Sequence, residues 1–276
     1  MPFRIIVRMT VTALVLQGLS LSLHAQAGQN SSAPSTDSLF RLDKPLKLLD
    51  KTNPKPFFQR KLVRASAVPV LLIGLGITTI KGNGMYSSYE AKEEIEEHLG
   101  GWHTRADDLL QFAPYVGLAT ASMFSFQMRD DRLNTLLLIA KSEAIMMASV
   151  HMTKRLTNVD RPNGQAYAFP SGHTAQAFLA ASIVHTEMRY KSPWYGVGAY
   201  TMATSVGVLR MINNKHWEAD VLAGAGFGIF SAHLAYLTHS HRWGRKPTLV
   251  GLNVTPAYFS GGTPGLTLSW HPVDAR

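Results

Sequence analysis

Residues 170–188 read PSGHTAQAFLAASIVHTEM, and this stretch decides how the chain folds. Ser171 is a typical N-cap residue, and the apolar run from Ala175 to Ile183 predicts a helix over 172–188. On its own, Ser171 serves as a helix cap and His173 as a structural histidine. The same opening also suits an anion, because Gly172 lets backbone N–H groups approach it and the helix dipole favours negative charge there.

Further helices are expected on both sides of this one. The candidates cover residues 65–80, 109–127, 132–153, 194–211 and 218–239, with turn-forming residues between them. Glu90 to His98 is an acidic helical run, which we expect to be a solvated face rather than a metal site. From Thr248 to Trp270 apolar and polar residues alternate around Ser260-Gly261-Gly262, which predicts a β-hairpin. The predicted fold is therefore all-α, a bundle of about six core helices with a small C-terminal β-hairpin.

Composition excludes several classes of function. Of the 276 residues, 46% are hydrophobic and 16% charged, which argues against disorder. The net charge of +9 is spread along the chain, without the basic stripe and aromatic residues that a nucleic-acid partner requires. The chain has no cysteine, which removes disulfides, thiolate metal sites and a cysteine nucleophile.

The N-terminus resembles an export signal. Arg4 and Arg8 precede a short apolar core, Met9 to Leu23, and Ala25-Gln26-Ala27 offers a cleavage site. A retained membrane anchor is the alternative. We expect a signal peptide over 1–27, a linker over 28–56, a helical domain over 57–246 and the hairpin tail over 247–276. The predicted location is the periplasm or cell envelope.

Two blocks of polar residues flank the central helix. Lys154 and Arg161, which Pro162 follows, lie before it, and Arg210, His216 and Asp220 lie after it. The cations taken singly are ordinary surface residues. His216 and Asp220 are four residues apart at the start of a helix, so they share one face. They are either an incidental pair or a histidine whose tautomer the carboxylate fixes, which frees the other ring nitrogen to attack.

Together these blocks resemble the type 2 phosphatidic acid phosphatase family, whose fold and site are shared with vanadium haloperoxidases and bacterial class A acid phosphatases. That family's pattern is Lys-x6-Arg-Pro, then Pro-Ser-Gly-His, then Ser-Arg-x5-His-x3-Asp. The chain matches it at Lys154, Arg161-Pro162, Pro170 to His173, Arg210, His216 and Asp220. Leu209 replaces the serine of the third block. The resemblance covers roughly residues 107 to 238 and is closest to the secreted bacterial branch.

The resemblance implies a phosphatase that needs no metal. Lys154, Arg161, Ser171, Gly172 and Arg210 would bind the phosphate, and vanadate could take its place as an analogue. His216, oriented by Asp220, would attack phosphorus to form a phosphohistidine, and His173 would protonate the leaving alcohol and later activate water. The expected substrate is a lipid phosphate, a polyprenyl diphosphate or a small soluble ester. The alternatives are a vanadate-dependent haloperoxidase and a non-catalytic envelope-binding protein.

Membrane integration is left open by the sequence. Uncharged windows at 109–128, 192–209 and 221–240 are long enough to span a bilayer. The third candidate helix contains Lys141 and Glu143, so it could span a bilayer only if these charged side chains were buried and paired. Six spans after a cleaved signal would place the phosphate-binding blocks in the cytoplasm and the basic ends outside. We therefore expect a periplasm-facing protein, soluble or peripherally attached, with integration as the alternative.

Overall fold

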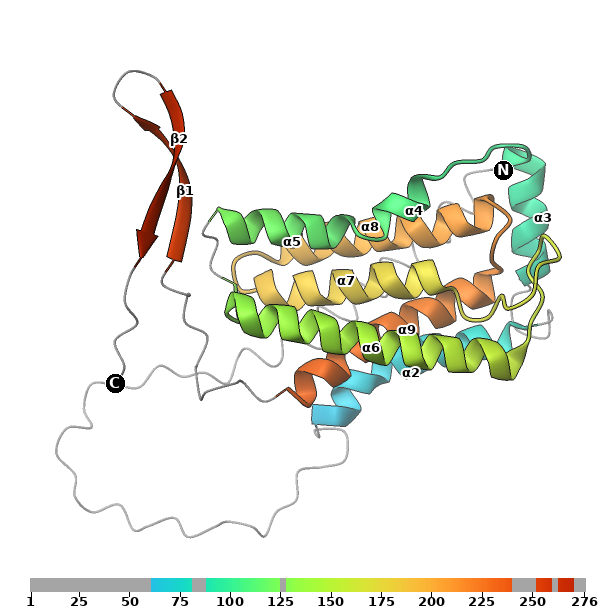
Figure 1. The fold of residues 1–276 in the computed structure, drawn as a ribbon. Coiled ribbons are helices and arrows are strands. Elements are labelled where there is room, and N and C mark those ends of the chain that lie inside the picture. The colour runs from blue at the N-terminus through green and yellow to red at the C-terminus, as the bar shows by residue number, and fades with distance from the viewer. Residues whose placement is uncertain (1–60, 81–87, 125–127, 240–251, 260–262, 271–276) are drawn as a thin grey trace, which may run out of the picture.

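The computed structural model describes residues 61–80, 88–124, 128–239, 252–259 and 263–270. Within these ranges the chain forms eight helices and two strands (Figure 1). The helices are α2 (Lys61–Thr78), α3 (Ser88–Leu99), α4 (Ala106–Leu110), α5 (Ala113–Met123), α6 (Arg132–Thr157), α7 (Gly172–Met188), α8 (Pro193–Ile212) and α9 (Glu218–Leu237). The all-α bundle predicted from the sequence is confirmed, and α2 and α5 to α9 correspond to its six core helices.

The predicted helix over 109–127 is wrong as a single element. The chain instead forms α4 and α5, which break at Gln111 and Phe112. The physical reason is Pro114, the second residue of α5, because proline lacks a backbone N–H and its ring clashes with the carbonyl of the residue four positions earlier. The acidic run over 90–98 forms α3, as expected.

Helix α6 is longer than predicted, and its extra turn matters for the site. It starts at the N-cap Asp131, whose side chain accepts from the backbone of Asn134, and it continues to Thr157. Asn158 then ends it in the left-handed conformation, with φ at 43°. The added turn contains Lys154, which therefore projects from a helix end.

The core is built around α7, which packs against both α8 and α9 (Figure 1). Its buried residues include Ala175, Leu179 and Ile183. Helix α9 approaches it unusually closely, because a Cβ atom at Gly228 would lie 2.2 Å from the Ala175 carbonyl oxygen and one at Gly224 would lie 2.6 Å from that of Ser171. This contact sets the first turns of α7 and α9 side by side.

The predicted charged pair in α6 takes a different form. Lys141 and Glu143 do not bind each other: the Lys141 ammonium donates to the carbonyl of Thr238 at 2.8 Å, and the Glu143 carboxylate accepts from Tyr115 and Gln176 at 2.7 and 2.5 Å. Glu143 thus joins α5, α6 and α7 through hydrogen bonds.

Two of the described helices, α6 and α9, are long and apolar enough to cross a membrane, a test that core helices of soluble proteins also pass. Helix α5 has 11 residues, so the predicted window at 109–128 is not one spanning helix. Two antiparallel strands, β1 (Leu252–Phe259) and β2 (Thr263–Trp270), lie in the segment predicted to form a hairpin, with Leu252 opposite Trp270.

Candidate active site

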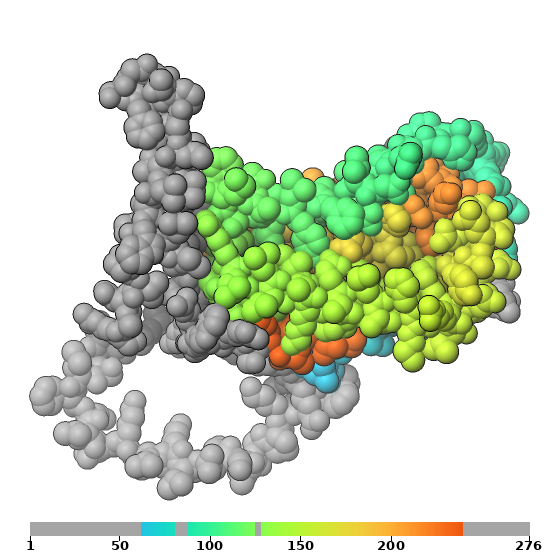
Figure 2. Space-filling model, in the orientation of Figure 1, coloured from blue at the N-terminus to red at the C-terminus, as the bar shows by residue number. Residues whose placement is uncertain are grey.

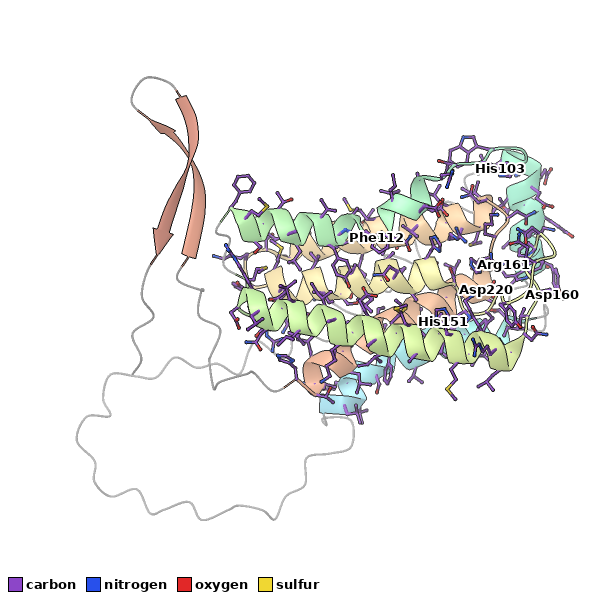
Figure 3. The ribbon with its side chains drawn as sticks, viewed as in Figure 1. His103, Phe112, His151, Asp160, Arg161 and Asp220 are labelled. Atoms are coloured by element: carbon purple, nitrogen blue, oxygen red, sulfur yellow. The ribbon has the colours of Figure 1, made fainter. Side chains whose placement is uncertain are left out.

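The predicted site residues gather at one end of the helical bundle, where α7 and α9 begin and α6 and α8 end. Arg161 and Asp220 lie at this end, and His151 lies on α6 (Figure 3). In the space-filling view, atoms of the α8–α9 region are visible between α3–α4 and the segment that follows α6 (Figure 2). All eight predicted residues are brought together: Lys154, Arg161, Ser171, Gly172, His173, Arg210, His216 and Asp220.

His216 and Asp220 form a buried pair at the start of α9. The His216 Nδ1 atom lies 3.2 Å from Asp220 Oδ2, and the same oxygen accepts from the backbone N–H of Trp217 at 2.9 Å. The carboxylate acceptor places the imidazole proton on Nδ1, so Nε2 carries the free lone pair. His216 is 3% exposed and Asp220 1% exposed, which shows that this pair is an internal group and not a surface contact.

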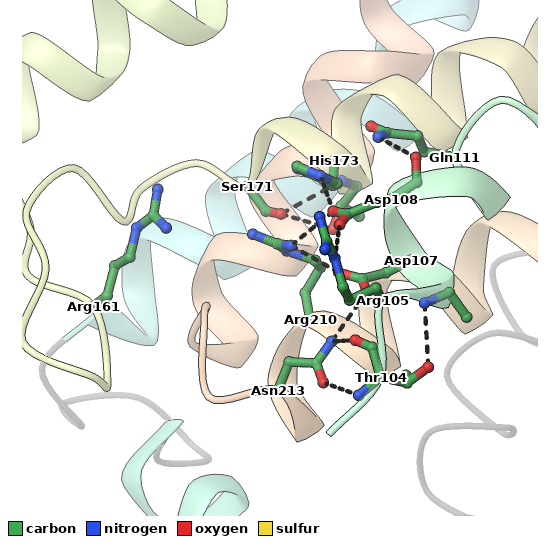
Figure 4. Close-up of polar contacts among 12 residues, drawn as sticks. Thr104, Arg105, Asp107, Asp108, Gln111, Arg161, Ser171, His173, Arg210 and Asn213 are labelled. Carbon is green, nitrogen blue, oxygen red and sulfur yellow. Dashed lines mark hydrogen bonds and ion pairs between the residues drawn. The ribbon is translucent and has the colours of Figure 1, made fainter. Parts of the chain in front are cut away.

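Arg210 lies at the end of α8 and is held by α4. Its Nη1 atom donates to Asp107 Oδ2 at 2.7 Å, and the other oxygen of Asp107 accepts from Asn213 Nδ2 at 3.0 Å (Figure 4). The Asn213 side chain also exchanges two hydrogen bonds with the backbone of Thr104, at 2.8 and 3.0 Å. The guanidinium is therefore anchored through one nitrogen while its remaining donors stay available.

Lys154 and Arg161 belong to the end of α6 and the turn after it. The Lys154 ammonium donates to the carbonyl oxygens of Tyr167 and Ala168 at 2.7 and 3.2 Å, which holds the turn against the helix. The Arg161 backbone N–H donates to Gln165 O at 2.7 Å. Arg161 lies on the side of Ser171 and Arg210 away from Asp107 and Asp108 (Figure 4).

Ser171 caps α7, as predicted. Its side chain accepts from the backbone N–H and the hydroxyl of Thr174, at 3.4 and 2.9 Å. Its own backbone N–H donates to the Asp220 carbonyl oxygen at 2.9 Å, which ties the start of α7 to the start of α9. Helix geometry leaves the N–H groups of Gly172 and His173 without intrahelical acceptors, so this end is suited to an anion.

His173 stands in the first turn of α7 and contacts α4. Its Nε2 atom lies 3.0 Å from Asp108 Oδ1, and that carboxylate is also 3.9 Å from Arg210 Nη1. Burial and the Arg210 charge lower the pKa of His173, while the carboxylates of Asp108 and Asp107 act in the opposite direction. His173 is therefore the second histidine of the site that a carboxylate contacts.

The cations of the site act together on His216. Burial holds the pKa of His216 well below its usual value, and the charges of Lys154, Arg210 and Arg161 lower it further. Burial, aided by Arg161, lowers the pKa of Lys154 to about 8. Burial also raises the pKa of Asp220 to about 7, against the pull of Lys154 and Arg161. These groups favour a neutral His216 and an added anion.

Two buried donors in the site have no hydrogen-bond partner within the described ranges. They are the Nε atoms of Arg161 and Arg210, both of which are guanidinium N–H groups. A buried donor without an acceptor costs roughly 1–3 kcal/mol. A phosphate or vanadate oxyanion would supply acceptors for both. Among the described residues, no three His, Cys, Asp or Glu side chains are grouped so as to hold a metal ion.

Comparison with known proteins finds two similarities. Residues 149–243 match the family model of the PAP2 superfamily. The chain also resembles a lipid A 1-phosphatase of Porphyromonas gingivalis, with 37% identity over 139 residues. That match covers 50% of this chain and 31% of the relative, so it spans about a third of the relative's length. No solved structure matches the chain.

Sequence reasoning missed the residues that hold the site from the side of α4. Asp107, Asp108 and Asn213 all contact predicted site residues or one another. Asp107 and Asp108 lie 103 and 65 positions from the partners Arg210 and His173 and carry no motif of their own. The sequence signal for them was their position, since Asp107 and Asp108 directly precede the uncharged stretch that begins at Leu109. The predicted site residues include three fixed cations and one carboxylate, so further carboxylates were needed to balance the charge.

Proposed function

We propose that this chain is a phosphatase that removes phosphate from a lipid through a phosphohistidine intermediate and without a metal. Lys154, Arg161 and Arg210 bind the non-bridging phosphate oxygens, together with Ser171 and the Gly172 N–H. In phosphoryl transfer, positioning and charge stabilisation supply most of the rate, and this set of donors provides both. The roles follow the residues of the family pattern one by one.

The first half of the proposed reaction forms the intermediate. His216 Nε2 attacks phosphorus in line, the bond from phosphorus to the leaving oxygen breaks, and His173 gives that oxygen its proton. Asp220 holds the proton on Nδ1 of His216 and stabilises the charge that develops on the ring.

The second half hydrolyses the intermediate. His173 takes a proton from water, the resulting hydroxide attacks phosphorus, and the bond from phosphorus to His216 breaks. Inorganic phosphate leaves, and both histidines return to their starting protonation states, so protons and charge balance over the cycle.

The observation that carries this proposal is the position of the two buried, unpartnered guanidinium donors. Arg161 and Arg210 present them beside the neutral, carboxylate-held His216. A merely structural cluster would satisfy such donors with protein acceptors, since unsatisfied buried groups are rare. A phosphate ester has several acceptor oxygens for these guanidinium donors and an electrophilic phosphorus for the His216 lone pair.

The lipid part of the proposal is supported by the relative, whose name states that it is a lipid A 1-phosphatase. Exposed apolar side chains near the site, such as Leu109 and Phe112, are suited to contact an acyl chain or a membrane surface. We also propose that the domain spans 57–246, that residues 1–27 direct export and that the site faces the periplasm.

The experiment is hydrolysis of a substrate panel by the purified full chain and by His216→Ala and Arg210→Ala variants. The panel includes p-nitrophenyl phosphate, phosphatidic acid, phosphatidylglycerophosphate, undecaprenyl diphosphate and lipid A. We expect each variant to lose more than about 10³-fold in kcat/KM, because each removes a group that acts on the transition state. The matched control is His151→Ala, an exposed histidine on α6 that contacts the carbonyl of Met147 in its own helix.

Trapping gives the mechanistic readout. Acid-labile phosphate should appear on the wild-type chain after a rapid quench and be absent from folded His216→Ala. Wild-type turnover by either site variant contradicts the proposal. Peroxide-dependent bromide oxidation after vanadate loading, without phosphate release from any ester, supports the haloperoxidase alternative instead.

A further inference from the structure

Helix α4 supplies two adjacent carboxylates to the site although it lies outside residues 149–243, the part of the chain that matches the PAP2 superfamily. The two carboxylates contact different groups. Asp107 bonds to Arg210 and Asn213, and Asp108 bonds to His173 (Figure 4). Adjacent residues of one short helix thus reach the phosphate-binding cation and the predicted proton donor separately.

The surroundings of the two residues differ as well. Asp107 is 1% exposed, and both of its oxygens are occupied by neutral or cationic donors. The Asp108 side chain is 44% exposed and lies between His173 and the solvent-exposed Arg105, whose Nε is 3.7 Å from Asp108 Oδ2. Asp107 therefore fixes an internal structure, whereas Asp108 is open to solvent on one side.

We propose that Asp108 is the positioning residue of His173, the proton donor of the function proposed above. The Asp108 carboxylate accepts from Nε2–H at 3.0 Å, which fixes the ring and leaves Nδ1 as the nitrogen that exchanges the proton. In the first half-reaction the Nδ1 proton passes to the leaving oxygen while Nε2–H stays bonded to Asp108. In the second half-reaction Nδ1 takes the proton back from water.

The resulting site contains two histidine–carboxylate pairs of opposite tautomer. His216 turns Nδ1 to Asp220 and keeps Nε2 for phosphorus, whereas His173 turns Nε2 to Asp108 and keeps Nδ1 for the leaving group. One pair attacks the phosphate and the other protonates what leaves. The carboxylate in each case determines which nitrogen takes part.

Charge gives Asp108 a second effect. The charged groups that act on His173 are Arg210 from α8 and Asp107 and Asp108 from α4. His173 in turn lowers the pKa of His216, the histidine before α9. Burial and Arg210 disfavour the imidazolium that a proton donor needs, and the two carboxylates favour it. Removing the Asp108 charge should lower the pKa of His173 further, so that the ring loses its proton at a lower pH.

The test compares Asp108→Asn with Asp107→Asn on two phosphate monoesters that differ in their leaving group. p-Nitrophenol leaves readily without a proton, whereas an alkyl alcohol requires one. For Asp108→Asn we expect a loss in kcat/KM of roughly 100-fold on the alkyl ester and less than about tenfold on p-nitrophenyl phosphate, within the range that a general acid contributes. For Asp107→Asn the loss should be the same on both esters, because Arg210 binds oxygens that every substrate has.

Two further measurements separate positioning from a general structural role. The alkaline limb of the kcat/KM profile should move to lower pH in Asp108→Asn and move less in Asp107→Asn, because Asp107 raises the pKa of His173 less than Asp108 does. Nitrogen NMR of the wild-type chain, with His173→Gln for assignment, should show the neutral His173 ring protonated on Nε2. This second measurement needs no variant that alters α4.

The outcomes are distinguishable. Equal losses on the two esters for Asp108→Asn, or an Nδ1–H tautomer of His173, overturn the role of Asp108 while leaving the phosphatase proposal in place. Absence of phosphatase activity in the wild-type chain rejects the proposed function and this inference with it.

Discussion

The two histidines of the site need opposite protonation states at the start of the reaction. His216 must be neutral to attack, and burial together with Lys154, Arg210 and Arg161 keeps its pKa well below the usual value. His173 must be protonated to act as an acid, although burial and Arg210 lower its pKa too. His216 is neutral above its pKa and His173 is protonated below its own. Both conditions therefore hold only between these two lowered pKa values.

This range leads to a prediction for the pH dependence of kcat/KM. Because kcat/KM reports the free enzyme, it should fall as pH rises through the His173 pKa, by about tenfold per pH unit. That pKa is lowered from the ordinary histidine value of about 6.5, so we expect an acidic optimum. The measurement is kcat/KM on an alkyl phosphate between about pH 4 and pH 9.

The control for this profile is His151→Ala, which should leave its shape unchanged because His151 is exposed and its ring contacts the Met147 carbonyl of its own helix. A plateau that continues above pH 8 or so would show that His173 is not the proton donor, since a lowered pKa cannot keep it protonated there.

At the scale of elements, the position of both histidines depends on how closely α9 packs on α7. Gly228 and Gly224 bring the α9 backbone against the carbonyl groups of Ala175 and Ser171. Neither carbonyl can move far, because Ala175 and Ser171 lie in the first turn of a buried helix. Small residues at this contact are therefore a requirement of the site and not just of the core.

We predict that Gly228→Ala destabilises the protein. The added Cβ would lie 2.2 Å from a backbone oxygen, and overpacking of this kind costs about 1–3 kcal/mol. For a chain of this size the melting temperature should fall by roughly 2 to 12 °C. Circular dichroism or calorimetry in one fixed buffer measures it.

The matched control is Gly198→Ala on α8, where an added Cβ meets no atom within 4 Å. This change should leave the melting temperature unchanged or raise it, since alanine favours a helix by up to about 1 kcal/mol over glycine. Equal melting temperatures for the two variants would mean that α9 and α7 are not in close contact.

The sequence was sufficient for most of these elements because each long helix carries an apolar pattern and turn residues at its ends. Ser171 as N-cap and the approach of His216 to Asp220 depend on neighbours in the chain and were predictable. Asp107 and Asp108 were not, because their partners lie at distant positions and come near only after α4 packs against α7 and α8. The break between α4 and α5 depends on one proline inside an otherwise continuous apolar stretch.

The surface of the whole molecule is unusually apolar on the outer faces of α2 and α6. The exposed large side chains there are Leu62, Val70, Leu71, Leu75 and Ile77 on α2, and Leu133, Leu136, Met147, Met152 and Leu156 on α6. Exposed apolar surface of this extent marks contact with a membrane or with another protein. Helix α6 is also the less buried of the two helices that could span a bilayer.

We therefore predict that the full chain associates with membranes. After cell breakage most of the protein should sediment with the membrane fraction, and detergent should release it. Resistance to a carbonate wash would indicate integration, and release by carbonate would indicate peripheral attachment. A monodisperse protein that stays in solution without detergent would contradict the prediction. A soluble phosphatase of the same compartment serves as the control for breakage.

The hydrogen bond from the Ser171 N–H to the Asp220 carbonyl joins the start of α7, which carries His173, to the start of α9, which His216 precedes. Their separation is therefore set by the backbone and is insensitive to side-chain exchange nearby. In contrast, α3 and the positions of α4 and of the Arg161 turn other than Asp107, Asp108 and Arg161 itself border the site without forming part of this link or of the groups that act on the phosphate. In such a protein, substitutions in these bordering segments, the rim of the site, can change which substrates bind while the distance between the two histidines stays the same. Directed evolution for a different leaving group should accordingly accumulate substitutions in the rim segments and leave the α7–α9 junction intact.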